Sequence, residues 1–66
     1  MKNNIKELRK SNHLRQEDLA GILGVTRQTI IAIENNKYDP TLELAMKISE
    51  YFRRSVNEIF QLDHER

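Results

Sequence analysis

The side chains best suited to chemistry in this 66-residue chain are those of Arg27 and Gln28, and their chemistry is recognition by hydrogen bonding. A guanidinium can bind guanine through O6 and N7, and a glutamine amide can bind adenine through N6 and N7. The chain has no cysteine, and its two histidines, His13 and His64, lie far apart without a carboxylate cluster around them. We therefore expect no enzyme activity, no metal site and no cofactor.

The elements that must position these residues are predicted to be helices. A chain with one proline and two glycines is poor in helix-breaking residues. Its length predicts a single domain over residues 1–66. Apolar spacing and capping residues predict an all-α fold of five short helices, at about residues 4–11, 16–23, 27–35, 42–52 and 56–60.

Local signals define the ends of these helices. Gly24 is expected to end the second helix in a left-handed conformation. Thr26 and Thr41 are expected to cap the third and fourth helices, and Ser55 with Glu58 forms a capping box for the fifth. On the third and fourth helices, the residues expected to face the core are Ile30, Ile33, Leu42, Ala45, Ile48 and Phe52.

Residues 16–35 carry the strongest functional pattern. They predict two helices joined by a tight turn at Gly24, with the small residue Ala20 where the helices cross. Apolar residues fill the angle between the two helices, and polar residues occupy the outer face of the second. This pattern is typical of a helix-turn-helix, whose second helix, here residues 27–35, enters the DNA major groove.

Three segments carry a family resemblance, namely LRQEDLA at 14–20, GVTRQTI at 24–30 and IENNKYDPTL at 33–42. With them the sequence resembles the phage repressor/Cro (XRE) type of helix-turn-helix transcriptional regulator, especially small stand-alone bacterial members similar to the cytolysin repressor. The resemblance implies a homodimer that binds an inverted-repeat operator in double-stranded DNA and acts as a repressor. It also implies a short antiparallel ribbon that pairs residues 2–4 with residues 61–64.

The resemblance assigns roles to individual residues. It implies a buried ion pair between Arg9 and Glu34. The residues expected to face the bases are Arg27, Gln28, Ile31 and Ala32. The residues expected near the DNA backbone are Arg15, Gln16, Thr26, Asn36, Lys37, Tyr38 and Thr41.

Several of these residues have open alternatives. Arg27 and Gln28 can be solvated surface side chains, and Arg9 and Glu34 can be two unrelated surface charges. Ile31 can contact a thymine methyl group or a sugar, or it can be an exposed isoleucine without a role. Lys37 can bind phosphate or be an ordinary surface lysine. Arg15 departs from the family pattern of serine or threonine at the cap of the second helix, because an arginine cannot accept the capping hydrogen bond and its charge opposes the helix dipole. Attraction to phosphate can offset that cost.

The fifth helix and the tail are the expected dimer surface. Their bulky apolar residues are Val56, Ile59, Phe60 and Leu62. Four such residues within seven positions are too many for one face of a small core. The alternative is that most of them cover the end of the helical bundle.

The charges are unevenly distributed along the chain. Residues 1–37 hold seven basic and four acidic side chains, whereas residues 38–66 hold four basic and six acidic ones. No apolar run approaches the ~20 residues of a membrane span, and we expect a cytoplasmic protein. The competing function is an antitoxin or a protein-interaction module of the same fold, and a protein co-regulator is a further conceivable partner.

Overall fold

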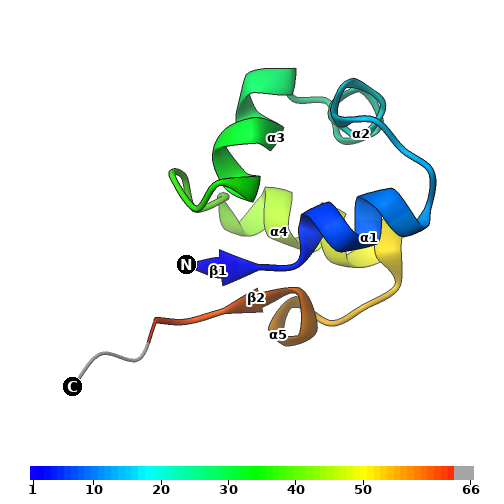
Figure 1. The fold of residues 1–66 in the computed structure, drawn as a ribbon. Helices are drawn as coiled ribbons and strands as arrows, with labels where there is room; N and C mark the ends of the chain where they lie inside the picture. Colours follow the sequence, from blue (N-terminus) through cyan, green and yellow to red (C-terminus); the bar gives the residue numbers. More distant parts are fainter. Residues whose placement is uncertain (64–66) are drawn as a thin grey trace.

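The computed structural model describes residues 1–63. It contains five helices and a two-stranded ribbon that joins the ends of the chain (Figure 1). The elements in chain order are β1 (Lys2–Asn3), α1 (Ile5–Ser11), α2 (Gln16–Leu23), α3 (Arg27–Glu34), α4 (Leu42–Phe52), α5 (Val56–Ile59) and β2 (Phe60–Gln61). The five predicted helices are confirmed, and their ends agree with the prediction within one residue.

Every helix contributes to one small core. The largest fully buried side chains are Ile5, Leu19, Ile30, Ile33, Ile48 and Ile59. These residues come from α1, α2, α3, α4 and α5. Because each helix buries at least one large aliphatic side chain against the others, the fold fixes the position of α3 from several sides at once.

The predicted helix ends are confirmed. The hydroxyls of Thr26 and Thr41 accept the amides of Thr29 and Leu44, each at 3.2 Å. Ser55 and Glu58 form the reciprocal capping box at α5. These caps satisfy amides that a helix start leaves without partners.

One predicted core residue is wrong. Leu42 is 74% exposed, and Leu44 is buried instead, beside Ala45 and Ile48. Leu42 directly follows the cap of α4, and a residue two positions before Leu44 lies about 200° away around a helix. The row of core-facing residues on α4 therefore begins about half a turn later than predicted. Phe52, at the other end of α4, is half-buried.

The ribbon pairs the two ends of the described chain. Lys2 lies opposite Gln61, and Asn3 lies opposite Phe60, in an antiparallel register. The backbone amide of Asn4 donates to the carbonyl of Ile59 at 3.1 Å and extends the pairing toward α5. The fifth helix thus ends at Ile59, one residue before the predicted end, because Phe60 has an extended backbone in β2. The predicted participation of His64 lies outside the described residues.

Ile59 and Phe60 of the expected dimer surface belong to the core of one protomer, and their role in a dimer stays a prediction. Ile59 is 0% exposed and Phe60 is 6% exposed within a single protomer. They cover the end of the bundle, which was the alternative interpretation. Val56 is half-buried and Leu62 is 69% exposed, so these two are the members of the predicted set that remain accessible.

Candidate nucleic-acid interface

The turn between α2 and α3 is a Schellman motif centred on Gly24. Gly24 has a left-handed backbone, with φ of 73° and ψ of 31°. The amide of Val25 donates to the carbonyl of Ala20 at 3.0 Å, and the amide of Gly24 donates to the carbonyl of Gly21 at 3.3 Å. This pair of bonds closes α2 and sends the chain directly into the Thr26 cap of α3. The angle between the two helices is therefore set by backbone geometry as well as by packing.

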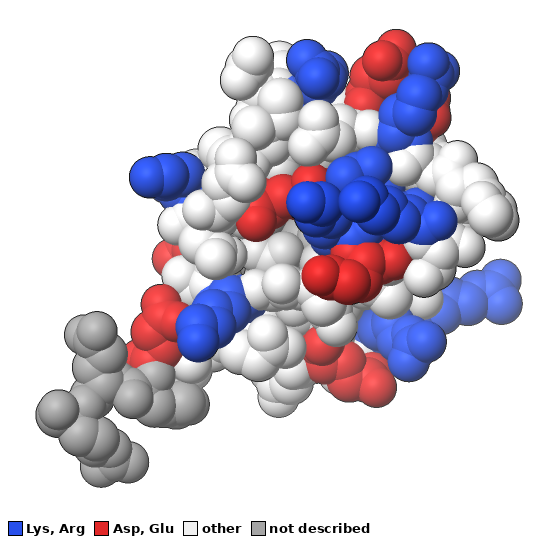
Figure 2. All heavy atoms as spheres, in the orientation of Figure 1, with Lys and Arg blue, Asp and Glu red and all other residues white. Residues whose placement is uncertain are grey.

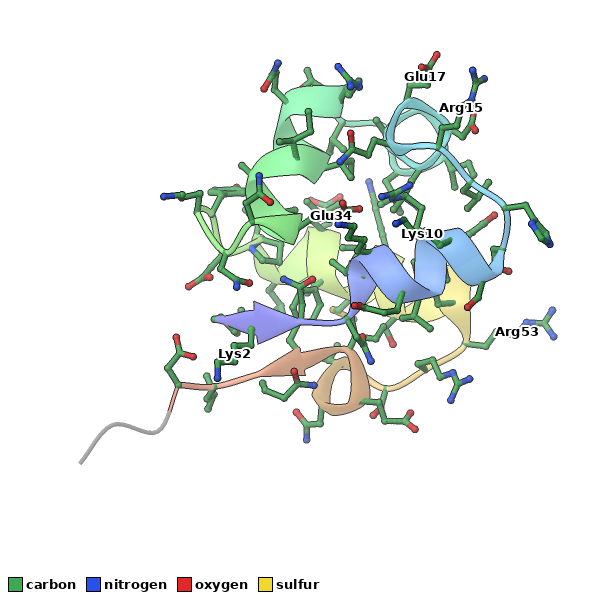
Figure 3. All side chains as sticks on the ribbon, in the orientation of Figure 1. Lys2, Lys10, Arg15, Glu17, Glu34 and Arg53 are labelled. Carbon is green, nitrogen blue, oxygen red and sulfur yellow. The ribbon has the colours of Figure 1, made fainter. Side chains whose placement is uncertain are left out.

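The carboxylate of Glu34 connects three helices. Arg9 in α1 donates to it through Nε at 2.7 Å and through Nη2 at 3.2 Å. Gln16 at the start of α2 donates to it through Nε2 at 3.1 Å. Figure 3 shows Glu34 pointing from the end of α3 toward the space beside α1. The structure thus contains the expected ion pair, and it adds Gln16 as a third member.

Arg9 also supports the connection between α1 and α2. Its Nη1 donates to the carbonyl of Leu14 at 2.9 Å, in the segment that leads into α2. The Arg9 side chain is only 9% exposed and that of Glu34 only 3%. A buried pair with this many hydrogen bonds has its charges satisfied, which burial of an ion requires.

The four residues expected to face the bases lie on α3. Arg27 and Gln28 are exposed in its first turn, whereas Ile31 and Ala32 are half-buried one turn later. The spacing of four residues between Arg27 and Ile31, and between Gln28 and Ala32, places the four on a common strip. Arg27 also lies beside Arg15 and Gln16 around one shallow surface hollow.

The residues expected near the DNA backbone fall into two groups, one before and one after α3 in the chain. Arg15 and Gln16 begin α2, and Thr26 caps α3. The second group, Asn36, Lys37, Tyr38 and Thr41, occupies the loop after α3 and the start of α4. Five of these seven side chains already have internal partners, since Thr26 and Thr41 act as caps, Arg15 binds Asp18, Gln16 binds Glu34 and Asn36 contacts Asn3.

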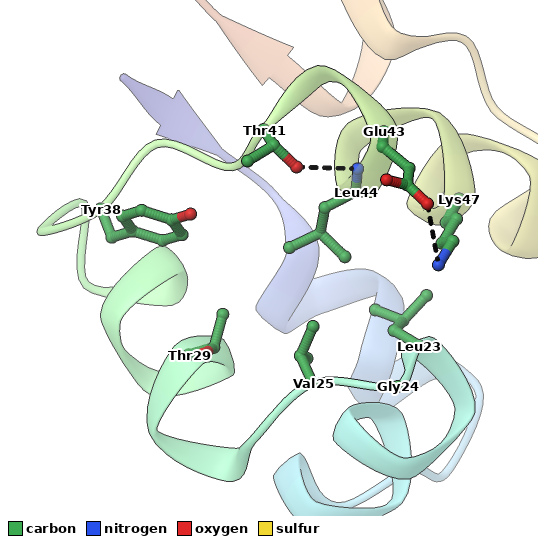
Figure 4. A pocket seen from close by; sticks show the side chains of 9 residues that line it. All are labelled: Leu23, Gly24, Val25, Thr29, Tyr38, Thr41, Glu43, Leu44 and Lys47. Atoms are coloured by element: carbon green, nitrogen blue, oxygen red, sulfur yellow. Dashed lines mark hydrogen bonds and ion pairs between the residues drawn. The ribbon is translucent and has the colours of Figure 1, made fainter.

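A hollow between α3, the loop and α4 is lined by three residues that carry hydroxyl groups, and the hydroxyl of Thr29 is paired with that of Thr26 at 3.0 Å. Thr29 of α3, Tyr38 of the loop and Thr41 at the start of α4 line it, together with Lys47 (Figure 4). Lys47 pairs with Glu43 at 3.4 Å across one turn of α4. Hydroxyl groups and a lysine are suitable donors for phosphate oxygens.

The side chain of Arg15 accepts no capping hydrogen bond at the start of α2, which agrees with the expectation for an arginine. Asp18 supplies another interaction at this helix start. The Asp18 carboxylate accepts the backbone amide of Arg15 at 2.8 Å and the Arg15 Nε at 3.2 Å. The guanidinium of Arg15 and then its backbone amide hold the pKa of Asp18 below its ordinary value of 3.8. Arg15 itself is exposed at the start of α2, beside Glu17 (Figure 3).

The charge on the surface is mixed. On the face that Figure 2 draws, the largest basic patch lies over α1, where Figure 3 places Lys10, and acidic side chains lie directly beside it. The face is therefore not a uniform basic field, and specific donors rather than bulk charge must define a phosphate-binding surface. Among the described residues, no helix has the length and apolar character needed to cross a membrane.

Sequence reasoning missed three residues at this surface. Thr29 and Lys47 lie at the rim of the hollow, and Asn3 contacts the end of α3. The capping pattern at Thr26 is the signal that identifies Thr29, because the amide of the third helical residue is the usual partner of a cap. No local signal connects Asn3 to residues thirty positions away.

The turn, the fixed angle between α2 and α3 and the exposed polar strip define a helix-turn-helix domain. The chain belongs to the Helix-turn-helix family of DNA-binding transcription regulators, whose family model matches residues 5–59. It is 57% identical over 60 residues to an uncharacterised HTH-type transcriptional regulator of Methanocaldococcus jannaschii, with 91% of each chain covered.

Two bacterial and phage relatives extend the comparison. The chain is 46% identical to the uncharacterised HTH-type transcriptional regulator YgzD of Bacillus subtilis, with 98% of each chain covered. It is 34% identical over 53 residues to the ImmF control region 10 kDa protein of Bacillus phage phi105, covering 80% of this chain and 59% of the phage protein. The predicted resemblance to small regulators of the phage repressor type is confirmed.

Proposed function

We propose that this protein is a transcriptional repressor that binds an inverted-repeat operator as a homodimer, with α3 in the major groove. The observation that carries the proposal is the exposure of Arg27 and Gln28 in the first turn of a helix that Glu34 fixes to α1 and α2. Side chains that read base edges must be free, while the helix that carries them must be rigid. Both conditions hold at α3.

The flanking groups suit contacts with the two sides of the groove. Arg15 and Gln16 lie before α3 in the chain, and Asn36, Lys37, Tyr38 and Thr41 lie after it. Contacts of this kind with the sugar-phosphate backbone set the position of the recognition helix but do not read the sequence. Each bidentate base contact contributes about 1–3 kcal/mol of discrimination. Two such contacts per protomer justify a dimer, which doubles the number of bases read.

The dimer is proposed to form at the end of the molecule that carries α5 and β2. Leu62 is strongly exposed there, beside a shallow hollow lined by Asn57, Phe60 and Gln61. We expect Leu62→Lys to shift the protein toward a monomer in sedimentation velocity. Operator affinity should fall with it, because one half-site then binds alone. A Leu62→Lys protein that sediments and binds like the unaltered protein would exclude this interface.

The base-reading role is tested on an operator obtained by selection from random DNA. We expect Arg27→Ala and Gln28→Ala to relax sequence preference at individual positions of that operator. Lys37→Ala should instead weaken binding to all sequences alike and reduce the salt slope by about one. Transcription from a promoter that overlaps the operator should fall as the protein is added. Unchanged or increased transcription would contradict the repressor role.

A protein co-regulator is a second candidate partner, and an exposed apolar surface favours it. Ile22 at the end of α2 and Tyr51 in α4 are 47% and 41% exposed, and they line one hollow with Lys47 and Glu50. Apart from Lys47, which also lines the hollow beside Thr41, this surface lies outside the proposed DNA contacts. Binding through it should depend little on salt, whereas binding through phosphates weakens steeply as the salt concentration rises.

A further inference from the structure

The side chain of Asn3 connects the ribbon to the end of α3. Its Nδ2 donates to the carbonyl of Ile33 at 2.9 Å and contacts Oδ1 of Asn36 at 3.4 Å. Its Oδ1 accepts the backbone amide of Ile5 at 3.1 Å, where α1 begins. One amide in β1 therefore contacts α1, α3 and the loop that follows α3.

These contacts are made where α3 passes into the proposed phosphate-binding loop. The carbonyl of Ile33 also accepts the backbone amide of Asn36 at 3.0 Å, so both of its lone pairs have donors. The backbone amide of Lys37 donates to the carbonyl of Ala32 at 2.8 Å. The last turn of α3 and the loop are thus joined by hydrogen bonds, and Asn3 is the member of this network that comes from neither of them.

The orientation of Asn36 follows from the contact with Asn3. Asn36 has a left-handed backbone with φ of 60°, and its side chain is exposed. Its Oδ1 lies 3.4 Å from the Nδ2 of Asn3, which leaves its own Nδ2 as the amide atom that can donate to an outside acceptor. An amide that presents its donor in this way is preorganised for a phosphate oxygen.

We propose that Asn3 is a positioning residue for DNA binding, which acts through Asn36 without touching the DNA. This role rests on the proposed function, because it requires Asn36 to contact the DNA backbone. The consequence is that the pairing of the two chain ends supports the DNA-binding loop as well as the stability of the fold. The ribbon is thereby part of the machinery that binds the operator.

Three substitutions separate positioning from simple loss of stability. Asn3→Asp keeps the acceptor for the Ile5 amide but loses the donor, and it places a carboxylate against two oxygens. Asn3→Ala loses both functions. The matched control is Asn4→Ala, because Asn4 is the next residue and its Nδ2 donates to the carbonyl of Glu58 at 3.3 Å, away from α3.

The measurement is operator affinity by fluorescence anisotropy, at a temperature where circular dichroism shows every variant folded. We expect Asn3→Asp and Asn3→Ala to weaken binding about five- to tenfold, the effect of losing one hydrogen bond. Asn4→Ala should leave the affinity within about twofold of the unaltered protein. In an Asn36→Ala background, Asn3→Asp should cost less than about twofold, since the group it positions is then absent. In a Gln16→Ala background, Asn3→Asp should still weaken operator binding about five- to tenfold.

Two results would overturn the positioning role of Asn3 and leave the proposed function intact. One is an equal loss for Asn3→Asp with and without Asn36→Ala, which would mean that the two residues act independently. The other is a loss for Asn4→Ala as large as that for Asn3→Asp, which would indicate a general effect of a weakened ribbon. Absence of operator binding by the unaltered protein would overturn the proposed function together with this role, so the two failures are distinguishable.

Discussion

The guanidinium of Arg9 in α1 lies 2.7 Å from the carboxylate of Glu34 at the end of α3, and both side chains are almost completely buried. Gln16 of α2 donates to the same carboxylate. A single acidic group therefore fixes the recognition helix to both preceding helices. Because the domain is small and its core is correspondingly limited, the loss of these hydrogen bonds is expected to lower the stability of the whole fold.

Removal of either charge should strongly destabilise the protein. Arg9→Met and Glu34→Leu each leave an uncompensated buried charge, and the expected loss is about 3 kcal/mol in the free energy of unfolding. The Arg9→Met/Glu34→Leu double variant should lose less than the sum of the single losses, because no charge is then left unpaired. Urea unfolding measures all three. Additive losses would show that the two residues are not energetically coupled.

Substitution of the two glycines by alanine should change the free energy of unfolding in opposite directions. Gly21 lies inside α2, and a Cβ added there meets nothing within 4 Å. Gly21→Ala should therefore raise the free energy of unfolding by up to about 1 kcal/mol. Gly24→Ala should lower it, because a Cβ strains the left-handed backbone of the Schellman turn. Thermal unfolding of the pair gives the comparison, and a stabilising Gly24→Ala would contradict this account of the turn.

Arg15→Thr should raise the melting temperature and weaken DNA binding. Threonine can accept a capping hydrogen bond that arginine cannot, and Asp18 already supplies the other half of a capping box. The loss of an exposed guanidinium removes attraction to phosphate. Calorimetry and a DNA titration test the two parts separately. A higher melting temperature with unchanged affinity would exclude the role of Arg15 in DNA binding.

The capping box of α5 should make stability dependent on pH. The backbone amide and then the hydroxyl of Ser55 hold the pKa of Glu58 below its ordinary value of 4.5. The folded state thus favours the charged carboxylate, and its stabilising contribution is present above pH 4.5 and lost as the pH falls through the lowered pKa. Glu58→Gln should flatten the decline in stability between about pH 5 and pH 3.

The matched control for this prediction is Glu50→Gln, which changes an exposed glutamate of α4 outside the box. Its unfolding free energy should follow that of the unaltered protein across the same pH range. Equal flattening in both variants would indicate a general charge effect rather than the capping box.

The features that sequence analysis predicted correctly are those with local causes. Gly24, Thr26 and Thr41 define helix ends through bonds within three or four residues, so their types alone are informative. Leu42 shows the limit of apolar spacing. Leu42 and Leu44 both fit a helical stripe with Ala45 and Ile48, and only the packing of α4 against the rest of the core decides which one is buried.

Contacts across the chain were not predictable from local pattern. The ribbon consists of two residues on each side, whose pairs are 59 and 57 positions apart, and only the family resemblance suggested it. Gln16 was expected at phosphate, and its bond to Glu34 depends on where α3 places that carboxylate. The burial of Ile59 likewise depends on how α5 folds back against β1 and α1. These features are products of tertiary structure and have no signature within a short window of sequence.

The central claim is that α3 reads bases in the major groove for a dimeric repressor, and selection from a pool of random double-stranded DNA tests it most directly. A salt titration on the selected sequence completes the measurement. We predict enrichment of an inverted repeat with half-sites about one helical turn apart, bound with a steep salt dependence. Enrichment of no sequence, with affinity that stays at the non-specific level, would contradict the claim.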